Sequence, residues 1–527
     1  MTHGPSEDGP GRIETGISRA SPLPVLAWTA GLVLFCVALV TCDKFISSFL
    51  ATPLKRDEVE FLHSTWLIHQ GARPFTDFFQ HHSPLYLELV VRFARDSIKL
   101  DWVIALRIFS VLLAGASACL VAILSGFISA GSYTLRPWVA GMSAIIFLLV
   151  AMQFPVFEIR PEAVAVPVFL AAWIAFEIAA RNSSQIGAAT FGLLAGLAIA
   201  ITPRAAWPVA SLFLAGVIFA IRDRDKHCLS RLFLAGMVCT VTLSCLLLAV
   251  ASPSDLIDWV YRFSRYSRPA SPLLDTISAA TLAWLLLPLV PVLLLAFAGR
   301  DLNARQRHSL LIPIGLLLAA LLGMSLEPRQ FGQSLSFIIV AVTVFYARCL
   351  GHFFLRINSG SRPSPFPILI VAAAYAIALS WQLNLLSIYV PHDLTSASDA
   401  KLVAAMRPDS ELHTALYARS TFCKRHIGHS VLVEPTEFHP ICLSDASYYW
   451  RGSEYLRAGT LEAAGIAAPH YRPLADAERS HPILIGPAFR KTAVPGEREK
   501  IDRFLDSEYH RSGWAYLRND NAAVIQP

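Results

Sequence analysis

Long apolar runs recur along this chain, and they constrain its fold more than any other feature. Residues 311–322 read Leu-Ile-Pro-Ile-Gly-Leu-Leu-Leu-Ala-Ala-Leu-Leu. Such runs occur too often to be buried in one soluble core. With 54% hydrophobic and 16% charged residues, the chain also departs from soluble domains, which are roughly one-quarter charged. The sequence therefore predicts an α-helical polytopic membrane protein.

The apolar runs give a first map of the membrane domain, predicted at 24–386. A bilayer core about 30 Å thick needs about 20 apolar residues per helix. About eleven runs approach that length, at 24–45, 103–129, 138–157, 163–180, 186–202, 205–221, 232–251, 277–299, 309–326, 332–350 and 366–386. The runs at 186–202 and 205–221 are short and meet at Thr202-Pro203-Arg204, so two crossings and a re-entrant pair both fit.

Charge placement sets the predicted orientation. Residues 1–23 are polar, lack a cleavage pattern for a secreted leader, and are predicted to be a disordered cytoplasmic tail. With the N-terminus inside, the positive-inside rule is satisfied because most interhelical basic residues fall on the cytoplasmic side. These are Arg136, Arg181, Arg222, Arg224, Lys226, Arg231, Arg300, Arg305, Arg307, Arg348, Arg356 and Arg362. An odd number of spans then places residues 387–527 outside.

The segment 387–527 is polar and rich in turns, and it is long enough for a small domain. Residues 431–433 and 483–485 are typical of buried strands and 496–507 of a helix, so we expect a small extracytoplasmic α/β domain. Cys423 and Cys442 both fall there. In an oxidising compartment they form a candidate disulfide that closes a loop of about 20 residues, worth about 3 kcal/mol.

The first outer loop, predicted at 46–101, contains the most informative sequence. Residues 55–71 predict an amphipathic interfacial helix, with Val59, Leu62 and Trp66 near one face and Gly71 as its terminator. Ser83 is a suitable N-cap and Pro84 a suitable first residue for a second surface helix through Phe93.

Asp57 and Glu58 stand where the chain leaves the bilayer. Reduced solvation raises the pKa of a carboxylate and suits it to general-base chemistry toward a hydroxyl. First-turn acids also simply complement a helix dipole. His81 and His82 are equally compatible with solvated loop residues, and their spacing alone implies no metal site. No metal is expected, because arginines can neutralise a single phosphate.

Three short outer loops each carry an arginine beside a proline, at Arg160, Arg204 and Arg329. One interpretation is snorkelling of arginines at helix ends. Three such arginines opposite an acidic loop favour a site for an anion, and guanidinium groups bind phosphate through paired hydrogen bonds. A lipid-linked phosphate would supply that anion.

Residues 71–84, Gly-Ala-Arg-Pro-Phe-Thr-Asp-Phe-Phe-Gln-His-His-Ser-Pro, resemble the motif G-x-x-P-Y-x-D-F-F-x-x-H-x-P of bacterial members of the GT-C superfamily. These are membrane-embedded glycosyltransferases, including aminoarabinose lipid A transferases and protein O-mannosyltransferases. The acidic pair Asp57-Glu58 and the run Ile159-Arg160-Pro161-Glu162 are similar to further motifs of that superfamily, with Glu162 where those proteins have Asp.

The resemblance implies a GT-C-like fold and an inverting transfer of a sugar from a polyprenyl-phosphate donor to a hydroxyl of a glycan, lipid or protein acceptor. It implies Asp57 as general base, supported by Glu58. Arg204 and Arg329 are then the first candidates for the donor phosphate, and the second candidates are Arg160, His81 and His82. Glu162 is a candidate for donor binding. It also implies a bacterial inner-membrane location with a periplasmic 387–527 domain, membrane lipids as surroundings, and no cofactor beyond the lipid-linked sugar.

Two other functions remain open from the residues alone. A transporter or flippase for a lipid-linked glycan would use the same arginines without needing Asp57 chemically. A non-catalytic assembly subunit would bind partners through 387–527. Nucleic acid is not an expected partner, because the basic residues are dispersed between apolar runs and form no continuous face.

Overall fold

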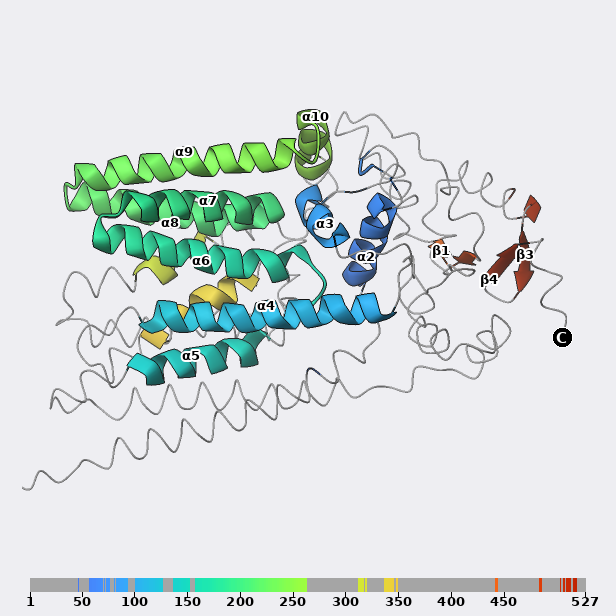
Figure 1. Cartoon of the computed structure of the whole chain (residues 1–527), viewed down its shortest axis with the longest axis horizontal. Coiled ribbons are helices and arrows are strands. Elements are labelled where there is room, and N and C mark those ends of the chain that lie inside the picture. The colour runs from blue at the N-terminus through green and yellow to red at the C-terminus, as the bar shows by residue number, and fades with distance from the viewer. Residues whose placement is uncertain are drawn as a thin grey trace, which may run out of the picture.

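The structure is a computed structural model whose described part is mainly a bundle of long helices (Figure 1). The described residues are 46, 56–69, 71, 73–75, 80, 82–92, 100–126, 136–151, 157–262, 311–316, 318–319, 336–345, 347–348, 441–443, 483–485, 503, 506–507, 509–512 and 515–518.

The helices follow the apolar runs of the sequence. In chain order they are α2 (Arg56–His69), α3 (Pro84–Val91), α4 (Leu100–Gly126), α5 (Arg136–Ala151), α6 (Pro161–Asn182), α7 (Gln185–Ile201), η2 (Pro203–Ala205), α8 (Ala206–Arg222), α9 (Lys226–Leu248), α10 (Pro253–Asp255) and η3 (Leu256–Arg262). Residues 311–316, 318–319, 336–345 and 347–348 are helical as well.

Four described helices are long and apolar enough to cross a membrane: Ala105–Gly126, Pro161–Asn182, Pro203–Arg222 and Lys226–Leu248. The predicted runs at 103–129, 163–180, 205–221 and 232–251 correspond to them. The runs at 24–45, 277–299 and 366–386 lie outside the described residues, so the total of eleven stays a prediction. The run at 138–157 overlaps α5, which is described from Arg136 to Ala151; residues 152–156 lie outside the described part.

Turn chemistry explains why the apolar stretch from 161 to 248 forms separate helices. Ser183 is left-handed with φ +52°, and Ser184 then caps α7 by accepting a hydrogen bond of 3.0 Å from the amide of Gly187. Asp225 caps α9 in the same way, accepting a 2.9 Å bond from the amide of Cys228. Each cap satisfies an amide that the first turn of a helix leaves without a helical partner.

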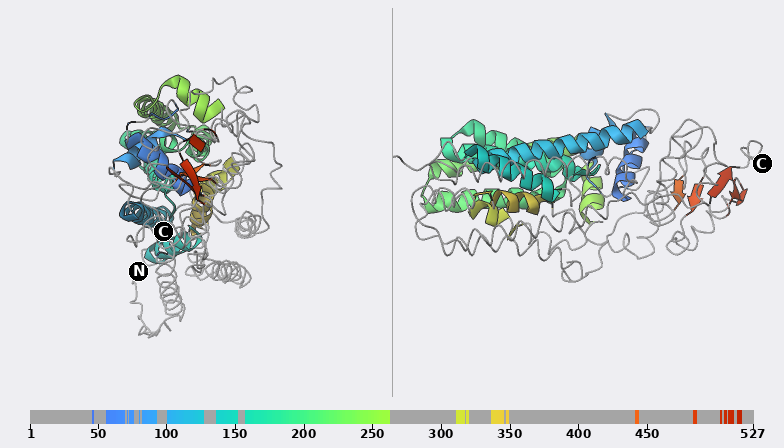
Figure 2. Two further views of the ribbon diagram at one scale, coloured as in Figure 1. Left: turned by 90° about the vertical axis from the view of Figure 1, so that its right-hand side faces the viewer. Right: turned by 90° about the horizontal axis from the view of Figure 1, so that it is seen from below.

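The helices α7 and α8 lie alongside α6 and α9 in the bundle (Figure 1, Figure 2). Each has 17 residues, which corresponds to about 26 Å of helix. Between them, η2 makes the reversal at Pro203. This arrangement favours two crossings over the re-entrant pair.

The close approach of α7 to α9 depends on two glycines of α7. A Cβ atom at Gly192 would overlap the carbonyl oxygen of Ala235, and one at Gly196 would lie 2.6 Å from the carbonyl oxygen of Cys239. Small residues at such a contact let helix backbones approach, which is how helices associate where lipid provides no hydrophobic drive.

Four short strands form a sheet in the order β1-β2-β4-β3: β1 (Ile441–Leu443), β2 (Ile483–Ile485), β3 (Tyr509–Ser512) and β4 (Ala515–Arg518). The β1–β2 pair is parallel, and β4 is antiparallel to both β2 and β3. The strand predicted at 483–485 is confirmed as β2. Residues 431–433 lie outside the described part, and the extracytoplasmic α/β domain stays a prediction.

The α7–α9 contact generates the first prediction. We expect Gly192→Ala to lower the free energy of unfolding by about 1–3 kcal/mol, because the new methyl group overpacks a backbone contact. Gly236→Ala on α9 is the matched control, since a Cβ there meets nothing within 4 Å. Thermal unfolding in detergent measures both variants. A Gly192→Ala protein as stable as Gly236→Ala would contradict the packing argument.

Candidate functional site

The helix α2 begins the site, and it confirms the helix predicted at 55–71. Its buried residues include Glu58, Phe61, Leu62 and Thr65, which follow the i, i+3, i+4, i+7 spacing of one helical face. Gly71 ends the helical path as predicted, with φ +86° and an amide that donates a 2.9 Å bond to the carbonyl of Ile68.

The helix α3 starts at Pro84 with Ser83 at its N-cap position, as predicted. The Ser83 side chain makes no capping bond to the helix, because its hydroxyl donates instead to the carbonyl oxygen of Ala200 at the end of α7. The position of this helix at the outer membrane surface stays a prediction. Leu85, Tyr86, Leu87 and Val90 are buried, because α3 packs against α2, α7 and α9.

The loop between α2 and α3 is tied down by Gln80. Its side-chain amide donates a 2.9 Å bond to the hydroxyl of Ser64, and its carbonyl oxygen accepts a 2.9 Å bond from the backbone amide of His82. The His82 ring lies 5.0 Å from the ring of Phe61. The part-buried imidazole of His82 is thereby held beside α2.

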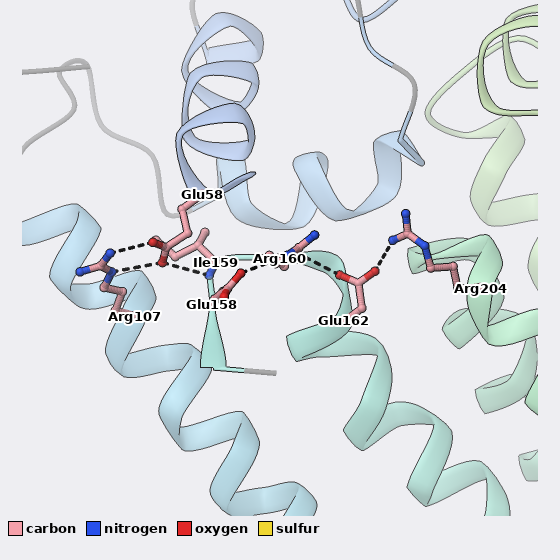
Figure 3. A network of polar contacts seen from close by, with 7 residues as sticks. All are labelled: Glu58, Arg107, Glu158, Ile159, Arg160, Glu162 and Arg204. Carbon is pink, nitrogen blue, oxygen red and sulfur yellow. Dashed lines mark hydrogen bonds and ion pairs between the residues drawn. The ribbon is translucent and has the colours of Figure 1, made fainter. Parts of the chain in front are cut away.

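Glu58 is fixed in a buried ion pair with Arg107 of α4. The Nη2 and Nε groups of Arg107 donate to the two carboxylate oxygens at 2.7 and 3.1 Å. The backbone amide of Ile159, in the segment before α6, donates to the same carboxylate at 3.4 Å. The exposed fractions of Glu58 and Arg107 are 0% and 1%. Figure 3 shows the carboxylate of Glu58 between α4 and the 157–160 segment.

A second set of charges continues from Ile159 toward η2 (Figure 3). The guanidinium of Arg160 donates a 3.1 Å bond to Glu158, and its Nε lies 3.7 Å from Oε2 of Glu162. Arg204 donates from Nη1 to Oε1 of Glu162. The carboxylate of Glu162 thus stands between two guanidinium groups.

We call this array the charge row; it comprises Arg107, Glu58, Glu158, Arg160, Glu162 and Arg204 (Figure 3). All six residues are buried. Three cations balance three carboxylates, so the row is neutral as a whole. Burying a charge is costly without a partner, and the alternation of sign explains how six charges are accommodated at this end of the bundle.

Tyr86 of α3 lies within electrostatic reach of the charge row. Burial raises the pKa of its hydroxyl well above the ordinary value, and the negative carboxylates of Glu162 and Glu58 raise it further. A buried tyrosinate at this position would be repelled by the carboxylates of Glu162 and Glu58. Tyr86 therefore stays neutral and keeps a proton to donate.

The structure brings together four residues predicted for the site, Glu58, Arg160, Glu162 and Arg204. His82 lies nearby, against α2. Asp57 is part of α2, directly before Glu58, but its side chain lies outside the described part. His81, Arg329 and Cys423 lie outside the described residues, as does the side chain of Cys442 in β1. The chemical roles of all of these residues stay predictions.

Sequence reasoning missed Arg107, Glu158 and Tyr86. Arg107 had a signal, since it is a charge inside an apolar run, where a buried partner is expected. Glu158 directly precedes the Ile159-Arg160-Pro161-Glu162 motif. No sequence feature marked Tyr86 as a site residue, because its surroundings depend on how α3 packs in the folded protein.

The described part of the chain contains no group of three or more His, Cys, Asp or Glu side chains that could hold a metal ion. The expectation of a metal-free site stays a prediction. The guanidinium groups of Arg160 and Arg204 are both paired with carboxylates of the charge row.

No protein-family model matches the chain, and no curated protein matches it. Among solved structures, the chain is similar to the crystal structure of ArnT from Cupriavidus metallidurans bound to undecaprenyl phosphate. The TM-score is 0.45 and the sequence identity 15%, over 76% of this chain and 70% of that chain. A likeness of this degree assigns no function to this chain.

The buried Glu58–Arg107 pair generates the second prediction. We expect Arg107→Met to lower the free energy of unfolding by about 3–5 kcal/mol, because it leaves a buried carboxylate without its cation. Adding Glu58→Gln should restore part of the loss. A double-mutant cycle of thermal unfolding measures the coupling. Additive effects of the two changes would show that the pair is not formed.

Tyr86 generates the third prediction, on pH dependence. Its raised pKa means that the folded protein keeps the hydroxyl proton to higher pH than the unfolded chain. Stability should therefore fall as pH rises above about 10, the ordinary tyrosine pKa. Tyr86→Phe, which keeps the ring, should show a smaller fall. Melting temperatures of both proteins from neutral to alkaline pH measure this, and parallel curves would refute it.

Proposed function

We propose that this protein is a membrane glycosyltransferase that moves a sugar from a polyprenyl-phosphate donor to an acceptor hydroxyl. The observation that carries the proposal is the charge row, which places the guanidinium groups of Arg160 and Arg204 at the same end of the bundle as α2, the helix that contains Asp57. The GT-C-like motifs at 57–58, 71–84 and 159–162 support the same reaction.

In this proposal Asp57 is the general base. Glu58 is a poor candidate because its two carboxylate oxygens already accept bonds from Arg107 and the amide of Ile159. A base must exchange a proton with the acceptor, and protonating Glu58 would remove the negative charge with which the buried Arg107 is paired. Glu58 instead fixes α2 against α4, which holds the backbone of the neighbouring Asp57.

The chemistry is an inverting displacement. The acceptor oxygen attacks the anomeric carbon while Asp57 takes its proton, and the bond from that carbon to the phosphate oxygen breaks with its electron pair. The departing polyprenyl phosphate gains negative charge. Arg160 and Arg204 would stabilise that charge through paired N–H donors, with His82 nearby and Arg329 and His81 as further proposed contributors.

Glu162 has a defined place in this scheme. It already occupies the space between Arg160 and Arg204 as their counterion. A donor phosphate would share these guanidinium groups with it, and each guanidinium has five N–H donors. Glu162 would thus keep both arginines oriented while the donor is absent.

The setting of the reaction is part of the proposal. We place the charge row on the periplasmic side of a bacterial inner membrane, with residues 387–527 forming a periplasmic domain beside it. The acceptor is a glycan, lipid or protein hydroxyl. The donor is the lipid-linked sugar, and neither a metal nor another cofactor is needed if the arginines neutralise one phosphate.

The fourth prediction tests the base. Asp57→Asn should lower kcat for transfer from a polyprenyl-phosphate sugar by about 100- to 10,000-fold, the usual contribution of a general base, with donor affinity retained. Glu88→Gln, which changes a part-buried carboxylate of α3 outside the charge row, should leave kcat unchanged. The measurement is turnover of radiolabelled donor by purified protein in detergent.

Two results would count against the proposal. Turnover by Asp57→Asn at the rate of the unaltered protein would remove Asp57 as the base. Donor binding without any transfer, under detergent conditions in which no compartments exist, would favour the flippase or transporter instead.

A further inference from the structure

The end of the bundle opposite the charge row holds a second group of buried charges. At this end lie the α6–α7 and α8–α9 turns (Figure 1), and we call it the turn end. Glu177 of α6 accepts a 2.9 Å bond from Arg348 and lies 3.4 Å from Arg181. It is fifteen residues along α6 from Glu162, or about 22 Å, so the two groups are separate.

A cavity of about 380 Å³ lies at the turn end, among α6, α7, α8 and α9. Its walls are mainly apolar and include Phe176, Phe191, Phe219 and Leu232. This volume falls in the range of about 300–1,000 Å³ that is typical of small-molecule pockets. The apolar walls suit a hydrocarbon chain.

The charged residues of the cavity lining carry a net positive charge. Glu177, Arg181 and Arg231 contribute to it, and Glu177 is already compensated by Arg348, whose exposed fraction is 0%. Arg231 pairs with Asp225 at 3.3 Å. Asp225 is far more exposed than Arg231, with exposed side-chain fractions of 42% and 10%, and a pair with one partner in solvent is weak.

The neighbouring surface strengthens the positive charge. Residues 222–231 contain four cations and two carboxylates, namely Arg222, Arg224, Lys226 and Arg231 against Asp223 and Asp225. The positive-inside pattern predicts that this end is cytoplasmic, and the cytoplasmic leaflet is the one whose anionic headgroups attract basic segments.

We infer that the turn-end cavity is a binding site for an anionic phospholipid, with one acyl chain between the aromatic walls and the phosphate at Arg231 and Arg181. The occupant is a lipid because the walls are apolar and the helices face a membrane. Its headgroup is anionic because the lining carries an excess of guanidinium groups. This site is separate from the charge row and does not depend on the proposed function.

The experiment is native mass spectrometry of the full-length protein, delipidated in detergent and incubated with one probe at a time. The probes are dilauroyl phosphatidylglycerol, dilauroyl phosphatidylcholine and glycerol 3-phosphate. We expect a retained adduct with phosphatidylglycerol only. Equal retention of phosphatidylcholine would refute the role of the cations, and equal retention of glycerol 3-phosphate would show a phosphate site without a lipid.

Variants locate the headgroup. Arg231→Gln should weaken phosphatidylglycerol binding by about tenfold, as expected for the loss of one charged hydrogen bond. Arg222→Gln is the matched control, since Arg222 is also paired with an aspartate but is exposed and does not line the cavity; it should bind as the unaltered protein does. Binding by Arg231→Gln equal to that of the control would overturn the assignment.

Asp225→Asn separates a headgroup role of Arg231 from a structural role of its ion pair. Asparagine keeps the N-cap of α9 and leaves the Arg231 cation without its carboxylate. The lipid site predicts binding equal to or tighter than that of the unaltered protein. Weakening equal to that in Arg231→Gln would show that the ion pair only stabilises the α8–α9 turn, and the proposal would fail.

Discussion

The buried ion pair between Glu58 and Arg107 joins three parts of the chain that are distant in sequence: α2, α4 and the segment before α6. A carboxylate removed from water needs its cation at hydrogen-bonding distance, so α2 has little freedom to shift against the bundle. The remaining charges of the row depend on this arrangement, because Glu158 and Arg160 flank the Ile159 amide that binds Glu58.

Helix positions could be predicted from the sequence, because the length of an apolar run and the residues that begin or end a helix are local features of the sequence. The runs at 163–180 and 232–251 became α6 and α9, and Gly71 and Pro84 marked helix ends correctly. The burial of α3 could not be predicted. Its residues are apolar on most sides, and local periodicity does not show which neighbour will cover them.

The candidate site was predictable in its residue types and only partly in its pairing. The motifs indicated Glu58, Arg160, Glu162 and Arg204, but not that Glu162 would be the counterion of both arginines. Partners such as Glu58 and Arg107 are 49 positions apart in the sequence. Such pairs are set by how helices pack, which in turn depends on close contacts like the glycine-mediated approach of α7 and α9.

The hydrogen bond from Ser83 to the carbonyl of Ala200 fixes the start of α3 to the end of α7. The last carbonyls of a helix have no partner within it. Here the carbonyl of Ala200, four residues before Arg204, accepts a hydrogen bond from the residue that precedes α3. This hydrogen bond therefore connects the loop that contains Gln80 and His82 to the end of α7, which leads directly to Arg204 of the charge row. The positions of this loop and of the backbone that carries Arg204 are therefore coupled through one hydrogen bond.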